Sequence, residues 1–151
     1  MRPLTILILI LLLTPSVFAG DWTGSPLIFD AIYYADHNSD VQQRIGYNKG
    51  KLHGHWKRFG LKEGRVGSPV FDARYYLKNN PDIARTYGEK NYAKAARHWI
   101  STGSAEGRVA HPDFNVHRYI EQNPSVSRTY GMNNYSGAIS HYLKNGYKQG
   151  Q

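Results

Sequence analysis

The stretch FDARYYLKNNPDIARTYGEKNYAKAARHWISTGSAEGR, residues 71–108, recurs twice more in this chain of 151 residues. Residues 114–151 carry the same order of Phe, Tyr, Asn-Pro, Arg-Thr-Tyr-Gly, Asn-Tyr, His and Gly, each 43 positions later. Residues 29–65 carry a copy that is one residue shorter and keeps the Phe-Asp, Tyr-Tyr, His-Trp and Glu-Gly-Arg groups. Self-similarity at a period of this length is typical of supersecondary units that pack against one another. The sequence therefore predicts a repeat protein.

The predicted fold class is all-α, with three tandem repeats of about 43 residues packed into one compact array after a cleaved signal peptide. Each repeat is expected to form about three short helices. The predicted parts are a signal peptide (1–19), an N-terminal lead-in or cap (20–28), repeat 1 (29–68), repeat 2 (69–111) and repeat 3 (112–151). We expect Trp22 of the lead-in to cover the end of repeat 1, because a terminal unit otherwise exposes the face that its neighbours bury.

The N-terminus has the pattern of a secretory signal peptide. Arg2 supplies a positive charge, residues 4–13 are an apolar run, and small residues precede an expected cleavage site after Ala19. Ten apolar residues are too few to cross a bilayer core, which needs about 20. The mature chain is therefore expected to be secreted, extracellular or periplasmic, without a membrane span; an uncleaved membrane anchor is the alternative.

Composition narrows the classes of function. The absence of Cys excludes disulfides, thiolate metal sites and cysteine nucleophiles. Twelve Tyr, three Trp and five Phe predict a core built mainly from aromatic rings. The net charge of +8 favours an anionic partner, although Lys and Arg spread along the repeats are also typical of a solvated face.

Capping residues mark the predicted starts of the first two helices in the repeats. Asp30, Asp72 and Asn115 each follow a Phe and precede a helical run, which is the place of an N-cap. Asn80 and Asn123 precede a proline and are expected to cap the second helix, because proline at the first helical position loses no hydrogen bond.

Glycines mark the predicted helix ends. The second helix of the repeats is expected to end at a left-handed glycine: Gly46, Gly88 and Gly131. The third helix, over about 49–59, 91–102 and 134–145, is expected to stop at the next glycine: Gly60, Gly103 and Gly146. The Glu-Gly-Arg turns at 63–65 and 106–108 need a glycine with positive φ. Their Glu and Arg are expected to pair with each other or with the next repeat, and residues 149–151 have lost both charges.

Two further sets of positions recur and are interpreted as structural. The phenylalanines that open the repeats are Phe29, Phe71 and Phe114, and the histidines of the third helix are His55, His98 and His141. Each of these histidines is expected to hydrogen-bond a backbone carbonyl or a tyrosine of its own repeat.

The pattern F-D-x-x-Y-Y-L-x-x-N-P-D-I, followed by H-W-I-x-x-G-x-x-E-G-R, resembles a short tandem repeat of secreted and surface proteins, and the resemblance covers residues 29–151. It implies a helical extracellular module with surface or glycan association. The first copy departs from the pattern at Ala35 and Ser39, and its third helix contains Gly50 and Gly54. Because glycine weakens a helix by about 1 kcal/mol relative to alanine, repeat 1 is expected to be the loosest.

Catalytic and metal-binding patterns are weak in this sequence. His53 and His55 are two residues apart, which places them on different faces of a helix, and no acidic residue lies beside them. A weak copper or zinc site there is the alternative to our expectation of no metal and no cofactor. The acidic pairs Asp30 with Asp40 and Asp72 with Asp82 could suggest a glycosidase, but we interpret all four as helix caps and predict no enzyme.

The predicted function is a non-catalytic binding module for an anionic or neutral glycan or another surface polymer. Aromatic faces stack on sugar rings and cations attract acidic groups, so the candidate ligand-binding residues combine both types. These residues are Arg74, Tyr75, Lys78, Arg85, Tyr87, Lys94, Arg97, Arg118, Arg128 and Tyr130. The alternative is a structural or adhesive subunit that self-associates through the face on which the repeats stack. A basic, aromatic surface also suits nucleic acid, but the predicted secretion argues against nucleic acid as the partner in vivo.

Overall fold

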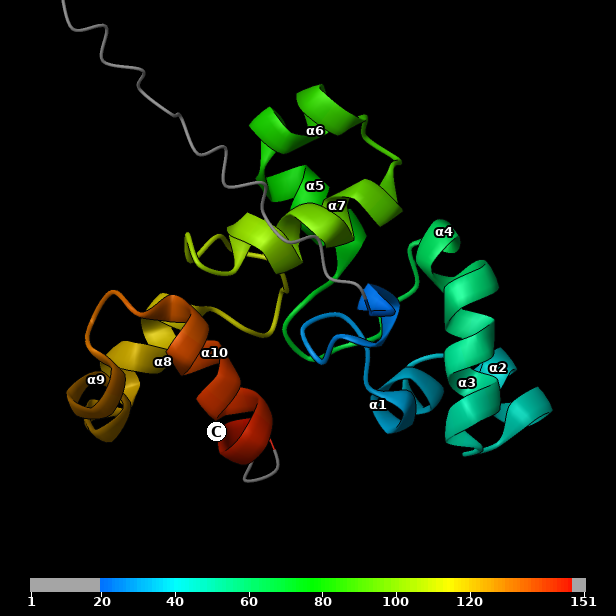
Figure 1. The fold of residues 1–151 in the computed structure, drawn as a ribbon, viewed down its shortest axis with the longest axis horizontal. Coiled ribbons are helices and arrows are strands. Elements are labelled where there is room, and N and C mark those ends of the chain that lie inside the picture. The colour runs from blue at the N-terminus through cyan, green and yellow to red at the C-terminus, as the bar shows by residue number, and fades with distance from the viewer. Residues whose placement is uncertain (1–19, 148–151) are drawn as a thin grey trace, which may run out of the picture.

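The computed structural model describes residues 20–147, so the predicted signal peptide (1–19) and the final turn (149–151) lie outside the described residues (Figure 1). The described chain is all-α, and its only β-type pairings are the isolated bridges Ser68–Phe71 and His111–Phe114. Among these residues, no helix has the length and apolar character that crossing a membrane requires.

We divide the described chain after the lead-in (20–28) into a first (29–68), a second (69–111) and a third segment (112–147). The lead-in contains the short 3-10 helix η1 (Trp22–Gly24). The first segment contains α1 (Ala31–Asp36), α2 (Ser39–Ile45), α3 (Lys49–His55), η2 (Trp56–Gly60) and α4 (Leu61–Glu63). The second contains α5 (Ala73–Asn79), α6 (Pro81–Tyr87), α7 (Tyr92–His98) and η3 (Trp99–Gly103). The third contains α8 (Val116–Gln122), α9 (Pro124–Tyr130), α10 (Tyr135–His141) and η4 (Tyr142–Gly146).

The predicted caps of the first helices are confirmed. Asp30 accepts a hydrogen bond from the Tyr33 N–H at 2.8 Å, and Asp72 and Asn115 cap α5 and α8 in the same way. The side chain therefore satisfies an N–H group that has no partner within the helix.

Asn80 and Asn123 occupy the predicted N-cap positions before Pro81 and Pro124, but neither side chain forms the expected capping hydrogen bond. The Asn80 side chain forms no capping bond; its Nδ2 donates to the carbonyls of Tyr76 at 2.8 Å and Val109 at 3.1 Å. Asn123 likewise donates to the Tyr119 carbonyl at 2.8 Å rather than capping α9. Each side-chain amide points back to the preceding helix, because the backbone carbonyls at the buried end of that helix have no donor within the helix and need one.

The third helices end at the predicted glycines Gly103 and Gly146 in the second and third segments, whereas in the first segment α4 continues past Gly60. Each runs without a break into a π-helical turn, and in the second segment the Ser104 N–H donates to the Trp99 carbonyl, five residues back, at 3.0 Å. Gly60 has helical φ and ψ of −54° and −43°, so these glycines do not end the helix by a left-handed turn. A positive φ is found instead at Gly46, Gly64, Gly88, Gly107 and Gly131, as predicted for them.

The residue at the end of each π-helical turn must be glycine because there is no room for a Cβ atom, and not because its φ is positive. A Cβ atom on Gly60 or Gly103 would collide with the hydroxyl of Tyr34 or Tyr76, and one on Gly146 would lie 2.7 Å from the Tyr119 hydroxyl. Each of these hydroxyls is held in place by a histidine Nδ1 atom, at 2.9, 2.8 and 2.8 Å, through the pairs Tyr34–His55, Tyr76–His98 and Tyr119–His141. The predicted role of the three histidines is therefore confirmed.

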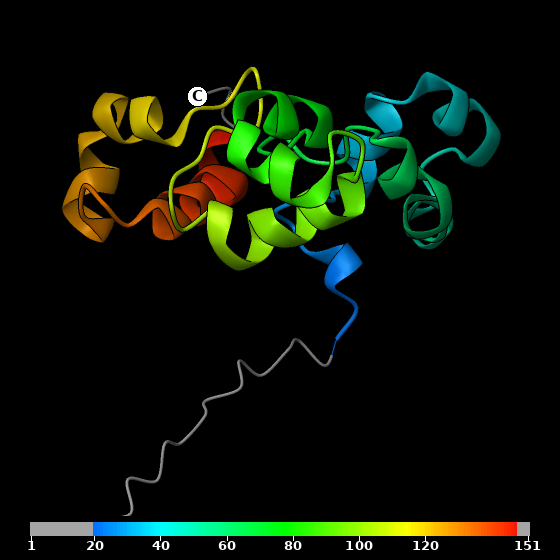
Figure 2. The same cartoon turned by 90° about the horizontal axis from the view of Figure 1, so that it is seen from above.

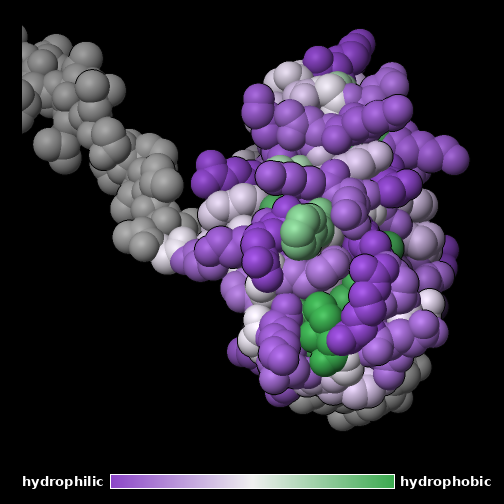
Figure 3. Space-filling view, turned by 90° about the vertical axis from the view of Figure 1, so that its right-hand side faces the viewer, coloured by the Kyte–Doolittle hydropathy of each residue, from purple (hydrophilic) through white to green (hydrophobic). Residues whose placement is uncertain are grey.

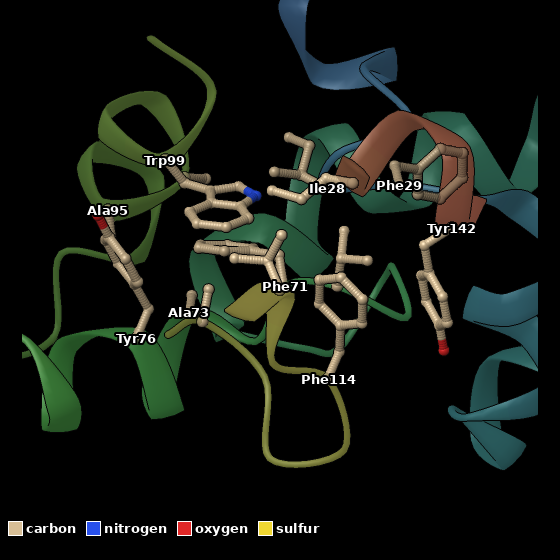
Figure 4. Packing of buried hydrophobic residues seen from close by; sticks show 14 of the residues in the cluster. Ile28, Phe29, Phe71, Ala73, Tyr76, Ala95, Trp99, Phe114 and Tyr142 are labelled. Atoms are coloured by element: carbon tan, nitrogen blue, oxygen red, sulfur yellow. The ribbon is translucent and has the colours of Figure 1, made fainter. Parts of the chain in front are cut away.

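The buried core combines aromatic rings with a larger number of aliphatic side chains, so it is not built mainly from rings as predicted; Figure 4 shows both kinds packed together. The rings have a similar arrangement in each segment. In the second segment, Phe71 stacks on Trp99 with ring centroids 5.9 Å apart, and Tyr76 meets Trp99 edge-on at 5.8 Å. The first segment repeats this geometry with Trp56, and the third repeats it with Tyr142 in place of tryptophan. Offset and edge-on ring pairs add to the free energy gained from burying their area.

The lead-in contacts both the first and the second segment rather than covering only the end of the first, and Figure 2 shows its η1 at one side of the molecule. Its Thr23 carbonyl accepts the Trp56 indole N–H at 3.0 Å, and its Leu27 carbonyl accepts the Trp99 indole N–H at 3.3 Å. The expected place of Trp22 is wrong, because its ring lies under the Arg97 guanidinium of the second segment, 4.9 Å from the centroid.

The first and third segments also contact each other. The Tyr33 hydroxyl lies 3.3 Å from His111 Nε2, and the Tyr33 and Tyr147 ring centroids are 5.7 Å apart. Figure 1 accordingly shows α1 beside the C-terminal end of the described chain. The first segment therefore contacts both of the others, and the three segments do not form an open row.

Consecutive segments meet at the Glu-Gly turns. The Tyr92 ring lies against Gly64, and Tyr135 lies against Gly107 in the same way. Arg65 and Arg108 bind their own Glu63 and Glu106, each at 2.6 Å, so the predicted pairing within the turn is confirmed. Both arginines also bind an aspartate of their own segment, Asp40 and Asp82.

Replacement of Gly103 by Ala tests the close approach of the tyrosine. We expect Gly103→Ala to lower the free energy of unfolding by about 2 kcal/mol, because overpacking displaces a buried side chain. In a Tyr76→Phe background, which removes the colliding hydroxyl, the same change should cost less than about 1 kcal/mol. Urea denaturation measures both values.

The exposed Gly50 in α3 is a matched control, because a Cβ there meets only Asn48 Oδ1 at 3.7 Å. Gly50→Ala should stabilise the protein by up to about 1 kcal/mol. An equal cost of Gly103→Ala in both backgrounds would contradict the steric explanation.

Acidification should destabilise the fold through its histidines. Burial lowers the pKa of His55, His98 and His111 below the ordinary value of 6.5. The unfolded chain then binds more protons, so this stabilisation is complete above pH 6.5 and is lost as the pH falls through the lowered pKa values. We expect Tm to fall by about 5 °C between pH 7.5 and pH 5 in calorimetry. A Tm that is constant or rises over this range would contradict the prediction.

Candidate functional site

The candidate functional site is a groove of about 490 Å³ on the second segment. It lies between α5, α6 and the start of α7, and it combines cations with an apolar floor. We call it the cationic groove; its lining residues are Arg74, Leu77, Lys78, Pro81, Ala84, Arg85, Glu89 and Tyr92.

Helical spacing places the cations on the same side. Arg74 and Lys78 are four residues apart on α5 and therefore lie on one face of that helix. Pro81 starts α6, and Arg85 follows it one turn later. Leu77, which is 3% exposed, turns inward from α5 and joins the hydrophobic core.

Arg74 is held by the neighbouring segment. Its Nε donates to the Gly64 carbonyl at 3.1 Å and its Nη2 donates to the Glu63 carbonyl, while the guanidinium carbon lies 5.4 Å from the centroid of the Tyr92 ring. Both carbonyls come from the turn that ends the first segment. The junction between segments thereby fixes one wall of the groove.

The groove carries an excess of positive charge. Arg74, Lys78 and Arg85 line it together with a single carboxylate, Glu89. Within residues 20–147, neither Lys78 nor Arg85 takes part in an ion pair. Unpaired cations around one depression attract an anionic ligand.

The other segments do not combine these charges. The positions of Arg74, Lys78 and Arg85 are occupied in the first segment by Ile32, Asp36 and Gln43, and in the third by His117, Glu121 and Arg128. The helices and core rings correspond in the three segments, whereas these outward positions differ. The cation triplet is therefore a feature of the second segment and not of the shared scaffold.

The remaining candidate residues lie elsewhere. Tyr75 and Arg118 line a second pocket, and Arg97 covers Trp22. The rings of Tyr87 and Tyr130 pack 6.0 Å from the third-helix histidine of their own segments. Lys94 and Arg128 are exposed on α7 and α9.

Sequence reasoning missed part of the groove. Leu77, Pro81, Ala84, Glu89 and Tyr92 were not among the candidate ligand-binding residues. The sequence alignment of the three segments offered one signal, because Tyr92 and Tyr135 align with Lys49 in the first segment, which follows the lead-in and not another segment.

The acidic side chains considered for catalysis have structural partners. Asp30 and Asp72 are caps, as predicted, but the cap roles predicted for Asp40 and Asp82 are wrong. Asp40 binds Arg65 at 2.7 Å and Asp82 binds Arg108 at 2.9 Å, and these hydrogen bonds lower the pKa of both carboxyl groups.

The two histidines considered for a metal site have different partners. His53 Nε2 lies 3.2 Å from the Thr23 hydroxyl, whereas His55 binds Tyr34. In the part of the chain that the structure describes, no three His, Asp or Glu side chains gather as ligands for a metal ion.

Comparison with known proteins found no match to this chain among protein-family models, curated proteins or solved structures.

Proposed function

We propose that this protein is a secreted, non-catalytic binding module that holds an anionic polymer, such as an acidic glycan of a cell surface or matrix, in the cationic groove. The observation that carries the proposal is the set Arg74, Lys78 and Arg85 around one depression with a single opposing carboxylate. Guanidinium and ammonium groups form charge-assisted hydrogen bonds with carboxylates and sulfates.

The floor of the groove supports a glycan over a small anion. Pro81 and Ala84 present apolar surface to the groove, and the Tyr92 ring also lines it. Sugar rings present C–H faces that pack on such surfaces, while their acidic groups point to the cations at the rim. A groove that is open to solvent also admits an extended chain.

The repeat organisation and the site of action belong to the same proposal. The three segments share capping side chains, tyrosine–histidine pairs and aromatic groups, which supports three tandem repeats as their origin. The N-terminal pattern in residues 1–19 supports secretion, and a secreted module meets acidic glycans more readily than nucleic acid.

The alternative of a structural or adhesive subunit has less support. Assembly surfaces present large apolar patches, whereas the face that carries the first segment is mainly hydrophilic with separate apolar spots (Figure 3). The contact between the first and third segments also uses surface that an open-ended fibre would need for stacking.

Affinity electrophoresis with polygalacturonate, heparin and neutral dextran tests the proposal. The wild-type protein should be retarded by the two anionic polymers and less so as NaCl is raised, because salt screens exposed charges. The double variant Lys78→Ala/Arg85→Ala should bind about tenfold more weakly, because it loses two charge-assisted contacts.

The matched control is Lys49→Ala/Lys51→Ala, which removes the same charge from α3 outside the groove. It should bind almost as well as the wild type. No retardation by either anionic polymer at low salt, or equal weakening in both double variants, would refute a specific groove.

A further inference from the structure

A second pocket of about 430 Å³ lies where the second and third segments meet, apart from the cationic groove. Its polar side chains come from α5, from the linker before α8 and from α8 itself, and aromatic side chains line it from the core. We call it the junction pocket; the residues on which the argument depends are Tyr75, His111, Asp113, Arg118, Gln122 and Tyr142.

Polar replacements on the shared scaffold gather at this pocket. Asp113, whose side chain is 90% exposed, takes the place of the fully buried Val70 in the preceding linker. His111 takes the place of Ser68, and Arg118 takes the place that Tyr33 and Tyr75 occupy in the other segments. The helices themselves form without these changes in the earlier segments, although His111 also makes the contact with Tyr33 of the first segment.

His111 forms a fixed wall of the junction pocket. It is 5% exposed, and its Nδ1 accepts the Asp113 backbone N–H at 3.1 Å. The ring proton is therefore on Nε2, which donates to the Tyr33 hydroxyl at 3.3 Å. Both ring nitrogens are used within the protein, so His111 shapes the pocket and leaves recognition to its neighbours.

The neighbours of His111 have hydrogen-bonding capacity to spare. Among the described residues, the Tyr75 hydroxyl, the Arg118 guanidinium and the Gln122 amide form no hydrogen bond with another side chain or carbonyl. The Asp113 carboxylate comes no closer than 4.0 Å to His111 Nδ1. The junction pocket therefore offers both hydrogen-bond donors and hydrogen-bond acceptors to a ligand.

This chemistry fits the hydroxyl groups of a sugar. A carboxylate accepts hydrogen bonds from hydroxyls, a guanidinium donates to them, and an amide or phenol does both. The pocket volume is within the range of small-ligand sites, roughly 300–1,000 Å³. The Asp113 carboxylate repels an acidic group, so the junction pocket differs in charge from the cationic groove.

We propose that the junction pocket binds a neutral pyranose unit of a glycan. The inference deepens the proposed function and rests on it for the ligand being a glycan. Arg118 and Asp113 would hold neighbouring hydroxyls of the ring, and Gln122 and Tyr75 would fix its orientation.

Saturation-transfer NMR with the methyl glycosides of glucose, galactose and mannose tests this site. At least one neutral glycoside should receive saturation from the wild-type protein, with little change on raising NaCl, because the contacts do not depend on a charged ligand. Arg118→Ala and Gln122→Ala should each weaken that binding by about fivefold or more. Far-UV circular dichroism verifies that the variants fold.

The groove variant Lys78→Ala/Arg85→Ala separates the two sites, because it should bind neutral glycosides like the wild type. Absence of saturation transfer to all three glycosides overturns the inference, as does unchanged binding by both Arg118→Ala and Gln122→Ala. If the anionic polymers are still bound in that case, the proposed function stands while the junction pocket fails. If neutral glycosides bind and the anionic polymers do not, the cationic groove fails instead.

Discussion

The hydrogen bonds between two buried indole groups and the lead-in organise this structure. Trp56 and Trp99 are 2% and 1% exposed, so their N–H groups must find acceptors inside the protein. The carbonyls of Thr23 and Leu27 are those acceptors, because the lead-in leaves them without a partner in a long helix. The lead-in consequently joins the first segment to the second.

Within each segment, a tyrosine hydroxyl connects the core to the third helix. The hydroxyl reaches the histidine at the end of that helix and fills the space beside the glycine that closes the π-helical turn. Burial raises the pKa of Tyr34 to about 12, and raises that of Tyr76 as well, so both phenols stay protonated at neutral pH. The tyrosine hydroxyl, the imidazole and the missing Cβ depend on one another, which explains why tyrosine, histidine and glycine occur together in all three described segments.

A core of this kind leaves the outer helix positions free to differ. Arg74 and Lys78 on α5, and Arg118 on α8, occupy positions that the aromatic core does not constrain. The same backbone therefore carries a groove with excess positive charge in the second segment and a polar pocket of mixed charge at the next junction. Surface chemistry varies while the packing beneath it is retained.

The sequence by itself determined the features that depend on near neighbours. Helical class, the caps at Asp30, Asp72 and Asn115, and the histidine positions could be predicted because their partners lie in the same copy, at recurring positions. The cationic groove was predicted only in part: helical spacing brings Arg74 and Lys78 together, but the wall formed by Tyr92 comes from another helix.

Tertiary structure alone decided the interactions between distant parts of the chain. The acceptors of Trp56 and Trp99 lie 33 and 72 residues away, and the Tyr33–His111 contact joins residues 78 positions apart. The Asn80 side chain likewise donates to the Val109 carbonyl, 29 residues away, and forms no capping hydrogen bond at the start of α6. No local pattern specifies such partners, because they depend on which polar groups remain unsatisfied after the helices have packed.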